Sequence, residues 1–149
     1  MTETPRVTVI APMRNEAKNV ARLAEEIAEA CAPFAPFEAI FVDDGSNDGT
    51  AEAIAAVRTR HPWLRLIRHR ASCGQSAALL SGVRAARAPV CATLDGDGQN
   101  PPSELPALLA PLLADGAGRI GLVAGQRIER QDRLSRRLVS RAANAIRRR

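Results

Sequence analysis

The chain has 149 residues, of which 46% are hydrophobic, and this is enough for one domain with a sizeable aliphatic core. Only 3% are aromatic and Tyr is absent, which argues against the base-stacking surfaces of single-strand nucleic-acid-binding proteins. The net charge is +5, no apolar run is long enough to span a membrane, and the three cysteines are widely spaced. Because residues 1–6 also do not resemble a signal peptide, we expect a soluble cytoplasmic protein with free thiols.

The first predicted strand is the unbroken apolar run Val7–Ala11, which we expect to be buried on both faces. A tight turn, Pro12–Glu16, follows the strand, and Asn15 is suited to cap the next helix. Apolar residues at helical spacing predict that helix over Val20–Cys31, and two prolines shortly afterwards end it.

A second strand, Phe37–Val42, runs into an acidic loop with the sequence Asp43-Asp-Gly-Ser-Asn-Asp-Gly-Thr50. The next helix is predicted from residue 50 to about residue 60, and the third strand, Trp63–His69, is short and flanked by arginines, as is typical of a sheet edge. The acidic loop has two interpretations. Its carboxylates contact a ligand beside the helix N-terminus, or the loop only caps the helix through Asp48 or Thr50.

Ser72–Gln75 fits a capping box that opens the third helix, which extends to about residue 86. Gly74 and Gln75 can also offer backbone N–H groups to a ligand. The fourth strand, Val90–Leu94, leads into Asp95-Gly-Asp-Gly-Gln-Asn-Pro-Pro102, and the two prolines suit the start of a helix that runs to about residue 113. After a turn that contains glycine, residues 120–124 form the fifth predicted strand.

Strands and helices alternate along the chain, which predicts an α/β fold with a mostly parallel sheet flanked by helices. In such a sheet, ligands bind at the carboxyl ends of the strands. Both Asp-Gly loops follow predicted strands and are therefore expected at this edge. The residues 1–149 are predicted to form a single domain.

Asp95 and Asp97 place two carboxylates at the end of the fourth strand. Close carboxylates repel each other unless a cation or a donor lies between them, and Mg²⁺ is usually held by one or two carboxylates together with substrate phosphates. The residues therefore indicate a site for a metal and a diphosphate, with a solvated Asp-Gly turn as the alternative. Spacing excludes a calcium loop, because Asn100 stands where glycine is needed and Pro106 where glutamate is needed.

The last segment, from about residue 130 to residue 149, has apolar residues at helical spacing and arginines on the other faces. Residues 119–149 hold ten arginines but only two acidic residues, whereas the rest of the chain is mildly acidic. The segment is a basic amphipathic helix that contacts membrane phosphates or a phosphorylated substrate, or it is a solvated helix. Nucleic acid is not an expected partner, because the chain has no recognition motif and few aromatic residues.

Three motifs in this order, Pro12–Glu16, Val42–Thr50 and Asp95–Pro102, resemble those of family 2 glycosyltransferases with the Rossmann-like GT-A fold. The likeness covers nearly the whole chain and is strongest to the dolichol-phosphate mannosyltransferase and polyprenyl-phosphate glycosyltransferase branch. It implies an inverting, metal-dependent hexosyltransferase that uses a UDP- or GDP-sugar and a polyprenyl or dolichyl phosphate. Such an enzyme would act in cell-envelope glycan synthesis, in peripheral contact with the inner face of the cytoplasmic membrane.

The resemblance also implies roles for individual residues. The nucleotide sugar would be contacted by Pro12, Arg14, Asn15, Glu16, Asp43, Asp44, Gly45, Ser46, Gly74, Gln75 and Asp95. Asp97 and Gln99 would lie nearest an Mg²⁺ or Mn²⁺ ion that neutralises the leaving diphosphate, and Asp95 would face the nucleotide. Arg127 is expected beside the acceptor phosphate, because a guanidinium matches that anion. The expected catalytic set is Asp95, Asp97, Gln99 and Arg127. No role is expected for His61 or His69, because an anionic acceptor needs little help from a base.

Proteins with this pattern continue beyond the point that corresponds to Arg149, so we expect a GT-A fold that is incomplete at its C-terminus. The nucleotide-sugar-binding part, about residues 6–127, is expected to be whole. A second hypothesis is therefore a nucleotide-sugar-binding fragment without transferase activity. An incomplete sheet also exposes an edge or an apolar face, which makes a homodimer a further expectation.

Overall fold

The computed structural model describes residues 3–116 and 118–125. In this part of the chain, one sheet is formed by β1 (Val7–Met13), β2 (Phe37–Asp43), β3 (Leu64–Arg68) and β4 (Val90–Thr93). The strand order is β3-β2-β1-β4, and every neighbouring pair is parallel. The predicted α/β fold with a parallel sheet is confirmed, and β3 lies at a sheet edge as expected.

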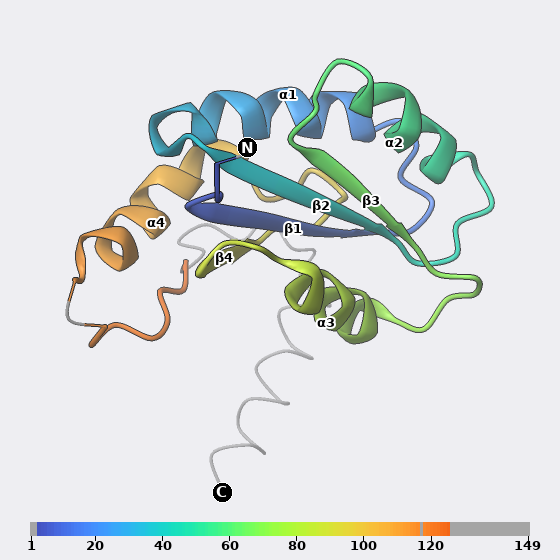
Figure 1. Ribbon diagram of the computed structural model, residues 1–149. Helices are drawn as coiled ribbons and strands as arrows, with labels where there is room; N and C mark the ends of the chain where they lie inside the picture. Colours follow the sequence, from blue (N-terminus) through green and yellow to red (C-terminus); the bar gives the residue numbers. More distant parts are fainter. Residues whose placement is uncertain (1–2, 117, 126–149) are drawn as a thin grey trace, which may run out of the picture.

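The crossover helices lie on both faces of the sheet. They are α1 (Val20–Cys31), α2 (Thr50–Arg58), α3 (Gln75–Ala85) and α4 (Leu105–Ala114), with two short 3-10 helices at Ala32–Phe34 and Pro102–Glu104. Figure 1 shows α1, α2 and α4 on one face of the sheet and α3 on the other. The first four predicted strands and all four predicted helices therefore occur, each within a few residues of the expected bounds.

Two apolar clusters hold the layers together. The larger lies under α1, α2 and α4 and includes Phe41 of β2, Ile27 of α1 and Leu109 of α4. The smaller joins Ile10 and Ile40 of the sheet to Ala78 of α3, together with Val42. Apart from half-buried residues at positions 12 and 37, β1 and β2 are buried throughout, because they pair on both sides and carry helices on both faces. This confirms the two-sided burial expected for the first strand.

Gly82 allows α3 to approach the sheet closely. A Cβ at this position would overlap the Cγ2 atom of Ile10 in β1. We expect Gly82→Val to lower the free energy of unfolding by about 1–3 kcal/mol, because the added methyls overpack a dense core. Urea denaturation measures this effect, with Gly121→Val as the control, since a Cβ at Gly121 meets no atom within 4 Å. Equal stability of the two variants would contradict the close packing of α3.

The predicted fifth strand is wrong. Residues 118–125 form no regular element, and Ile120 and Leu122 are 42% and 81% exposed. An apolar run becomes a strand only when a neighbouring strand completes its hydrogen bonds, and in the described part of the chain β4 pairs with β1 alone. The apolar pattern of residues 120–124 does not show whether a neighbouring strand is present to pair with them.

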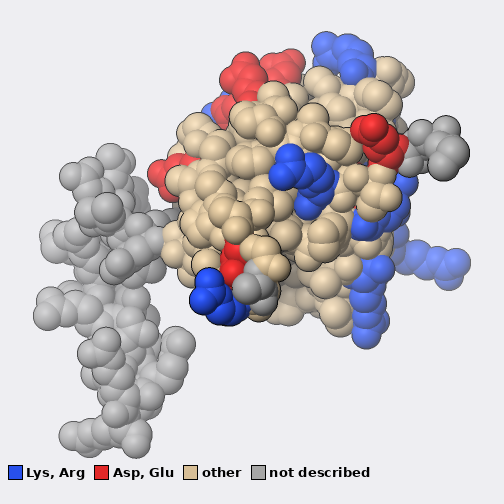
Figure 2. Space-filling model, turned by 60° about the vertical axis from the view of Figure 1, so that its left-hand side comes forward, with Lys and Arg blue, Asp and Glu red and all other residues tan. Residues whose placement is uncertain are grey.

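The charge of the described surface is mixed. Figure 2 shows one face on which most side chains are uncharged and the Lys and Arg side chains stand at separate places. Among the described residues, no helix is both long and apolar enough to cross a membrane. The predicted basic helix, about residues 130–149, lies outside the described part, so its contact with a membrane stays a prediction, as does the homodimer.

Candidate functional site

A cleft with a volume of about 330 Å³ opens at the carboxyl ends of β1, β2 and β4. It is lined by Pro12, Met13, Arg14, Glu16, Asp44, Gly74, Gln75, Asp95, Gly96 and Asp97. These residues come from the last two positions of β1, from the loops after β1, β2 and β4 and from the start of α3. Parallel pairing in the order β2-β1-β4 brings the carboxyl ends of these strands to one edge, where the two Asp-Gly loops were expected.

The sequence-predicted residues fall into three groups. Those that line the cleft are Pro12, Arg14, Glu16, Asp44, Gly74, Gln75, Asp95 and Asp97, joined by Met13 and Gly96, which were not predicted. Those that do not line it are Asn15, Asp43, Gly45, Ser46 and Gln99. Arg127 lies outside the described residues. The cleft therefore gathers most of the predicted nucleotide-sugar set, while its role in binding stays a proposal.

Asn15 connects two loops instead of capping a helix, so the capping prediction is wrong. Its φ of +57° is the left-handed conformation that Asn tolerates better than most residues, and α1 begins only at Val20. The backbone N–H of Asn15 donates to Ser46 Oγ at 2.9 Å, and Asn15 Oδ1 accepts from the N–H of Asn47 at 3.0 Å. These bonds hold the turn after β1 against the acidic loop after β2.

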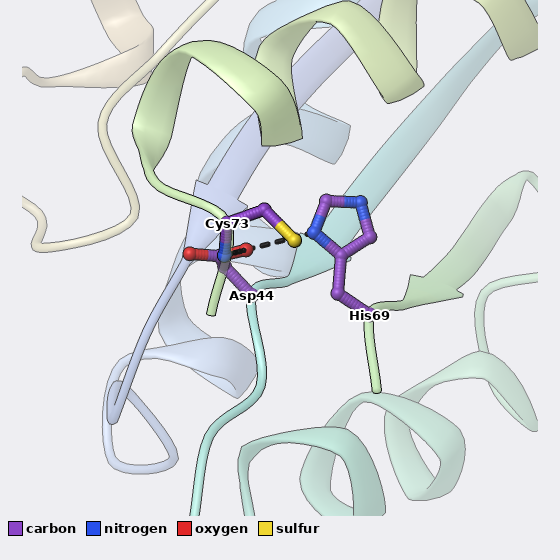
Figure 3. Close-up of side chains that lie close together, drawn as sticks. All are labelled: Asp44, His69 and Cys73. Atoms are coloured by element: carbon purple, nitrogen blue, oxygen red, sulfur yellow. Dashed lines mark hydrogen bonds and ion pairs between the residues drawn. The ribbon is translucent and has the colours of Figure 1, made fainter. Parts of the chain in front are cut away.

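Asp44 is a buried carboxylate whose oxygens accept four hydrogen bonds. Oδ1 accepts from His69 Nδ1 at 2.7 Å and from the N–H of Cys73 at 2.8 Å. Oδ2 accepts from Ser72 Oγ at 2.8 Å and from the N–H of Gly74 at 2.9 Å. Figure 3 shows the carboxylate facing His69 and Cys73. Asp44 therefore holds the loop between β3 and α3 against the end of β2.

These contacts also explain why Ser72–Gln75 is not the predicted capping box. α3 begins without a side-chain cap, because Ser72 donates to Asp44 while Gln75 Nε2 donates to Asp95 Oδ1 at 2.8 Å. The loop before α3 approaches the loop after β2 closely at Gly45, where a Cβ would lie 2.5 Å from the backbone nitrogen of Ser72. The φ of +67° at Gly45 requires glycine for a second reason.

The environment of Asp44 favours its ionised form. Burial by itself would raise the pKa of Asp44, but the hydrogen bonds from Cys73, His69, Ser72 and Gly74 more than offset it and hold the pKa well below its usual range. Because the carboxylate is ionised, it can only accept, so the hydrogen in the bond to His69 must be carried by Nδ1.

We expect this lowered pKa to make stability depend on acid. A carboxylate whose pKa falls on folding stabilises the protein fully above its unfolded pKa, ordinarily 3.8 for Asp44, and this stabilisation is lost as the pH falls toward the folded pKa. Asp44→Asn should be less stable at neutral pH and should lose less stability on acidification. Urea denaturation from about pH 7 to about pH 3 measures how the free energy of unfolding depends on pH in the unchanged protein and in the variant. The same loss of stability on acidification in both proteins would contradict this role of Asp44.

His69 was missed by sequence reasoning. It lies between two arginines, and its sequence context does not indicate a functional role. In the parallel register of β2 and β3, however, Arg68 lies opposite Asp43. The next residues along both strands, Asp44 and His69, are therefore neighbours at the sheet edge. The register of two parallel strands was the only feature that could have revealed the pair.

Asp43, the other member of the predicted pair, lies outside the cleft. Its side chain is fully buried, and Oδ1 accepts from the N–H of Ser46 at 3.0 Å. Oδ2 lies 3.5 Å from Arg68 Nε and accepts no hydrogen bond within the described part of the chain. The adjacent carboxylates thus face different surroundings, and of the two only Asp44 reaches the cleft.

Asp95 and Asp97 supply oxygen atoms to one wall of the cleft. Asp95 accepts from Gln75 Nε2 and, at 2.9 Å, from Asn100 Nδ2, while Asp97 is exposed and accepts from the N–H of Gln99 at 3.0 Å. The residue between them must be glycine, because a Cβ at Gly96 would lie 2.7 Å from the carbonyl oxygen of Pro12. Two carboxylates beside a cleft fit a hard divalent ion such as Mg²⁺ or Mn²⁺, which prefers oxygen ligands.

The fold and this site define an open α/β domain whose ligand cleft lies at the carboxyl ends of parallel strands. The chain belongs to glycosyl transferase family 2, whose family model matches residues 8–147. The fold is therefore GT-A-like, as the three motifs predicted.

Similar proteins place the chain more closely within the family. It is 38% identical to an undecaprenyl-phosphate 4-deoxy-4-formamido-L-arabinose transferase of Pseudomonas savastanoi pv. phaseolicola, over 93% of this chain and 40% of the relative. The transferase of the same name in Yersinia enterocolitica is 34% identical, over 95% and 42%. A Pyrobaculum calidifontis mannosyltransferase, solved with GDP-Man and Mn²⁺, superposes with a TM-score of 0.66 at 32% identity, over 77% of this chain and 34% of that one. The chain thus spans about 40% of the length of the curated relatives it matches.

Proposed function

We propose that this chain binds a nucleoside-diphosphate sugar, UDP- or GDP-linked, and transfers the sugar with inversion to a polyprenyl phosphate or a related lipid acceptor. The observation that supports this most is the cleft itself. Its walls combine the carboxylates of Asp95 and Asp97 after β4 with Arg14 after β1 and the buried Asp44 after β2. A diphosphate with a divalent cation fits between Asp95, Asp97 and Arg14, and a nucleoside fits on the side of Asp44.

Each side of the cleft has a chemical task in this proposal. Glu16 offers carboxylate oxygens to the N–H and O–H donors of a nucleoside, and Asp44 does the same by exchanging one of the four hydrogen bonds that it accepts from the chain. Arg14 and the backbone N–H groups at the start of α3 attract the phosphates. Asn15 and Ser46 act by fixing the two loops rather than by direct contact, since they bond to each other and do not line the cleft.

Asp95 and Asp97 are the residues that would hold Mg²⁺ or Mn²⁺ together with the diphosphate. When bound, this ion would neutralise the charge of the departing diphosphate. Gln99 was predicted as a metal ligand, but its backbone N–H bonds to Asp97 and its side chain does not line the cleft. We assign to Gln99 the task of orienting the Asp97 carboxylate.

The acceptor side of the proposal rests on relatives and on sequence. The relatives from Pseudomonas and Yersinia are undecaprenyl-phosphate transferases by name, which supports a polyprenyl phosphate. Arg127 is proposed to contact this phosphate, and the basic segment 130–149 to contact the membrane. The sugar stays open, because these relatives carry an arabinose derivative and the solved relative carries mannose.

The alternative is a domain that binds the nucleotide sugar but does not transfer it. The observation that favours this alternative is the coverage of about 40% of the relatives' length. Sugar transfer from a labelled donor to undecaprenyl phosphate by the purified chain would exclude the alternative. Donor binding without transfer would support it.

Calorimetric titration with UDP- and GDP-sugars, with and without Mn²⁺, tests the donor site without the acceptor. We expect binding of one nucleotide class that requires the metal. A folded protein that binds neither class would overturn the proposed function, including the alternative. Binding that does not depend on the metal would overturn the assignment of Asp95 and Asp97.

A further inference from the structure

We propose that Asp44, His69 and Cys73 form a binding site for a thiophilic divalent cation of the Zn²⁺ class, separate from the oxygen ligands of Asp95 and Asp97. One carboxylate oxygen, one imidazole nitrogen and the thiol sulfur all lie within 4.8 Å of one another. Figure 3 shows the thiol of Cys73 turned toward the hydrogen bond between Asp44 and His69. The site shares Asp44 with the donor cleft, but its other two ligands, His69 and Cys73, do not line that cleft, and its test requires no transferase activity.

The ligand set selects the cation. Sulfur, nitrogen and oxygen together suit Zn²⁺ and similar borderline-soft ions, whereas Mg²⁺ and Mn²⁺ prefer oxygen alone. Three protein ligands leave the fourth position of a tetrahedral ion for water, and Cys73 is exposed, so that solvent and ions reach the site from its side. The other exposed cysteine, Cys91, lies on β4 and belongs to no such cluster among the described residues.

Only a small movement of two side chains is needed to admit an ion. The distance of 2.7 Å between His69 Nδ1 and Asp44 Oδ1 is that of a hydrogen bond, while two ligands of one tetrahedral Zn²⁺ lie about 3.3 Å apart. The two side chains therefore need to separate by only about 0.6 Å. Asp44 keeps its bonds to Ser72 and Gly74 through the other oxygen, and the thiol gives up only a long hydrogen bond of 3.4 Å to the carbonyl of Ala71.

Ser81 supplies the outer contact that a metal-binding histidine needs. His69 Nε2 lies 2.9 Å from Ser81 Oγ of α3, so the far side of the ring is already held. On binding, the hydrogen of Nδ1 moves to Nε2 and is donated to Ser81, and the thiol proton goes to solvent. The cation thus takes the place of the hydrogen between His69 and Asp44.

Cobalt titration tests the site, because a Co²⁺ ion bound by a thiolate has a near-ultraviolet charge-transfer band. We expect one Co²⁺ per chain with this band, displaced by Zn²⁺, and a higher Tm in the presence of Zn²⁺ because the ion clamps the loop between β3 and α3. Cys73→Ser should abolish the band. His69→Asn, which keeps a donor for Asp44 but removes the nitrogen ligand, should weaken binding about a hundredfold, and Ser81→Ala about tenfold.

Two matched controls decide which residues bind. Cys91→Ser removes the other exposed thiol, and Asp97→Ala removes the oxygen site, and both should keep the band and the Zn²⁺ effect on Tm. A band that survives Cys73→Ser or disappears in Cys91→Ser would overturn the proposal, as would an absent band in the unchanged protein. Circular dichroism checks that each variant is folded, and Cys73→Ser with Ser81→Ala carries the test if His69→Asn does not fold.

Discussion

Asp97→Ala is expected to abolish metal-dependent binding of the nucleoside-diphosphate sugar and to leave the protein folded. Removing one of two carboxylates that hold the cation removes several kcal/mol of binding free energy, which corresponds to more than about a hundredfold in Kd. Asp97 is exposed and accepts a hydrogen bond from the N–H of Gln99, so its loss should change stability by no more than about 0.5 kcal/mol. The variant also no longer has the repulsion between the carboxylates of Asp95 and Asp97, which should stabilise the fold slightly.

Calorimetry with and without Mn²⁺ measures this effect, and urea denaturation measures the stability. Glu25→Ala is a matched control, because Glu25 is an exposed acid on α1 and does not line the cleft. Unchanged metal-dependent binding in Asp97→Ala would place the metal elsewhere. Loss of cooperative unfolding would instead make the Asp95–Asp97 loop a structural feature.

Glu38→Ala is expected to cause a large loss of stability. Glu38 lies on β2, is 2% exposed and is surrounded by donors. Oε1 accepts from Thr8 Oγ1 at 2.9 Å and from the N–H of Arg87 at 2.7 Å, and Oε2 accepts from Arg65 Nη1 at 3.0 Å and from Arg87 Nε at 2.9 Å. One carboxylate thus connects β1, β2, β3 and the segment after α3.

Alanine at position 38 leaves buried donors without an acceptor and two guanidinium groups without their counter-charge. We expect a loss of about 3 kcal/mol, at the lower end for a broken buried ion pair, because Arg65 and Arg87 both reach solvent. Burial would raise the pKa of Glu38, but the hydrogen bonds from Arg87, Thr8 and Arg65 lower it. Its stabilisation is therefore present above the unfolded pKa and is lost as the pH falls.

Urea denaturation at neutral pH checks this expectation, with Glu52→Ala as the control. Glu52 also pairs with an arginine, Arg68, at 3.3 Å, but its side chain is 67% exposed, so its loss should change stability by no more than about 0.5 kcal/mol. A Glu38→Ala variant as stable as Glu52→Ala would show that the network around Glu38 contributes little.

The sequence by itself determined the order of the elements and the edge at which the cleft lies. Strand and helix periodicities are local, so the unbroken run of β1, the helical spacing of α1 and the turns after β1, β2 and β4 were readable without any partner. Parallel pairing then had to bring the Asp-Gly loops to one edge, where Asp44, Asp95 and Asp97 line the cleft.

Only the tertiary structure decided which groups meet. Asn15 and Ser72 both have good local capping chemistry, yet Asn15 bonds to residues 31 and 32 positions away and Ser72 to Asp44, 28 positions away. The pairing of Asp44 with His69 and the burial of Glu38 depend on strand register, and the run at residues 120–124 found no strand to pair with in the described part of the chain. Hydrogen bonds need a partner at a given distance and angle, and a single chain position does not specify one.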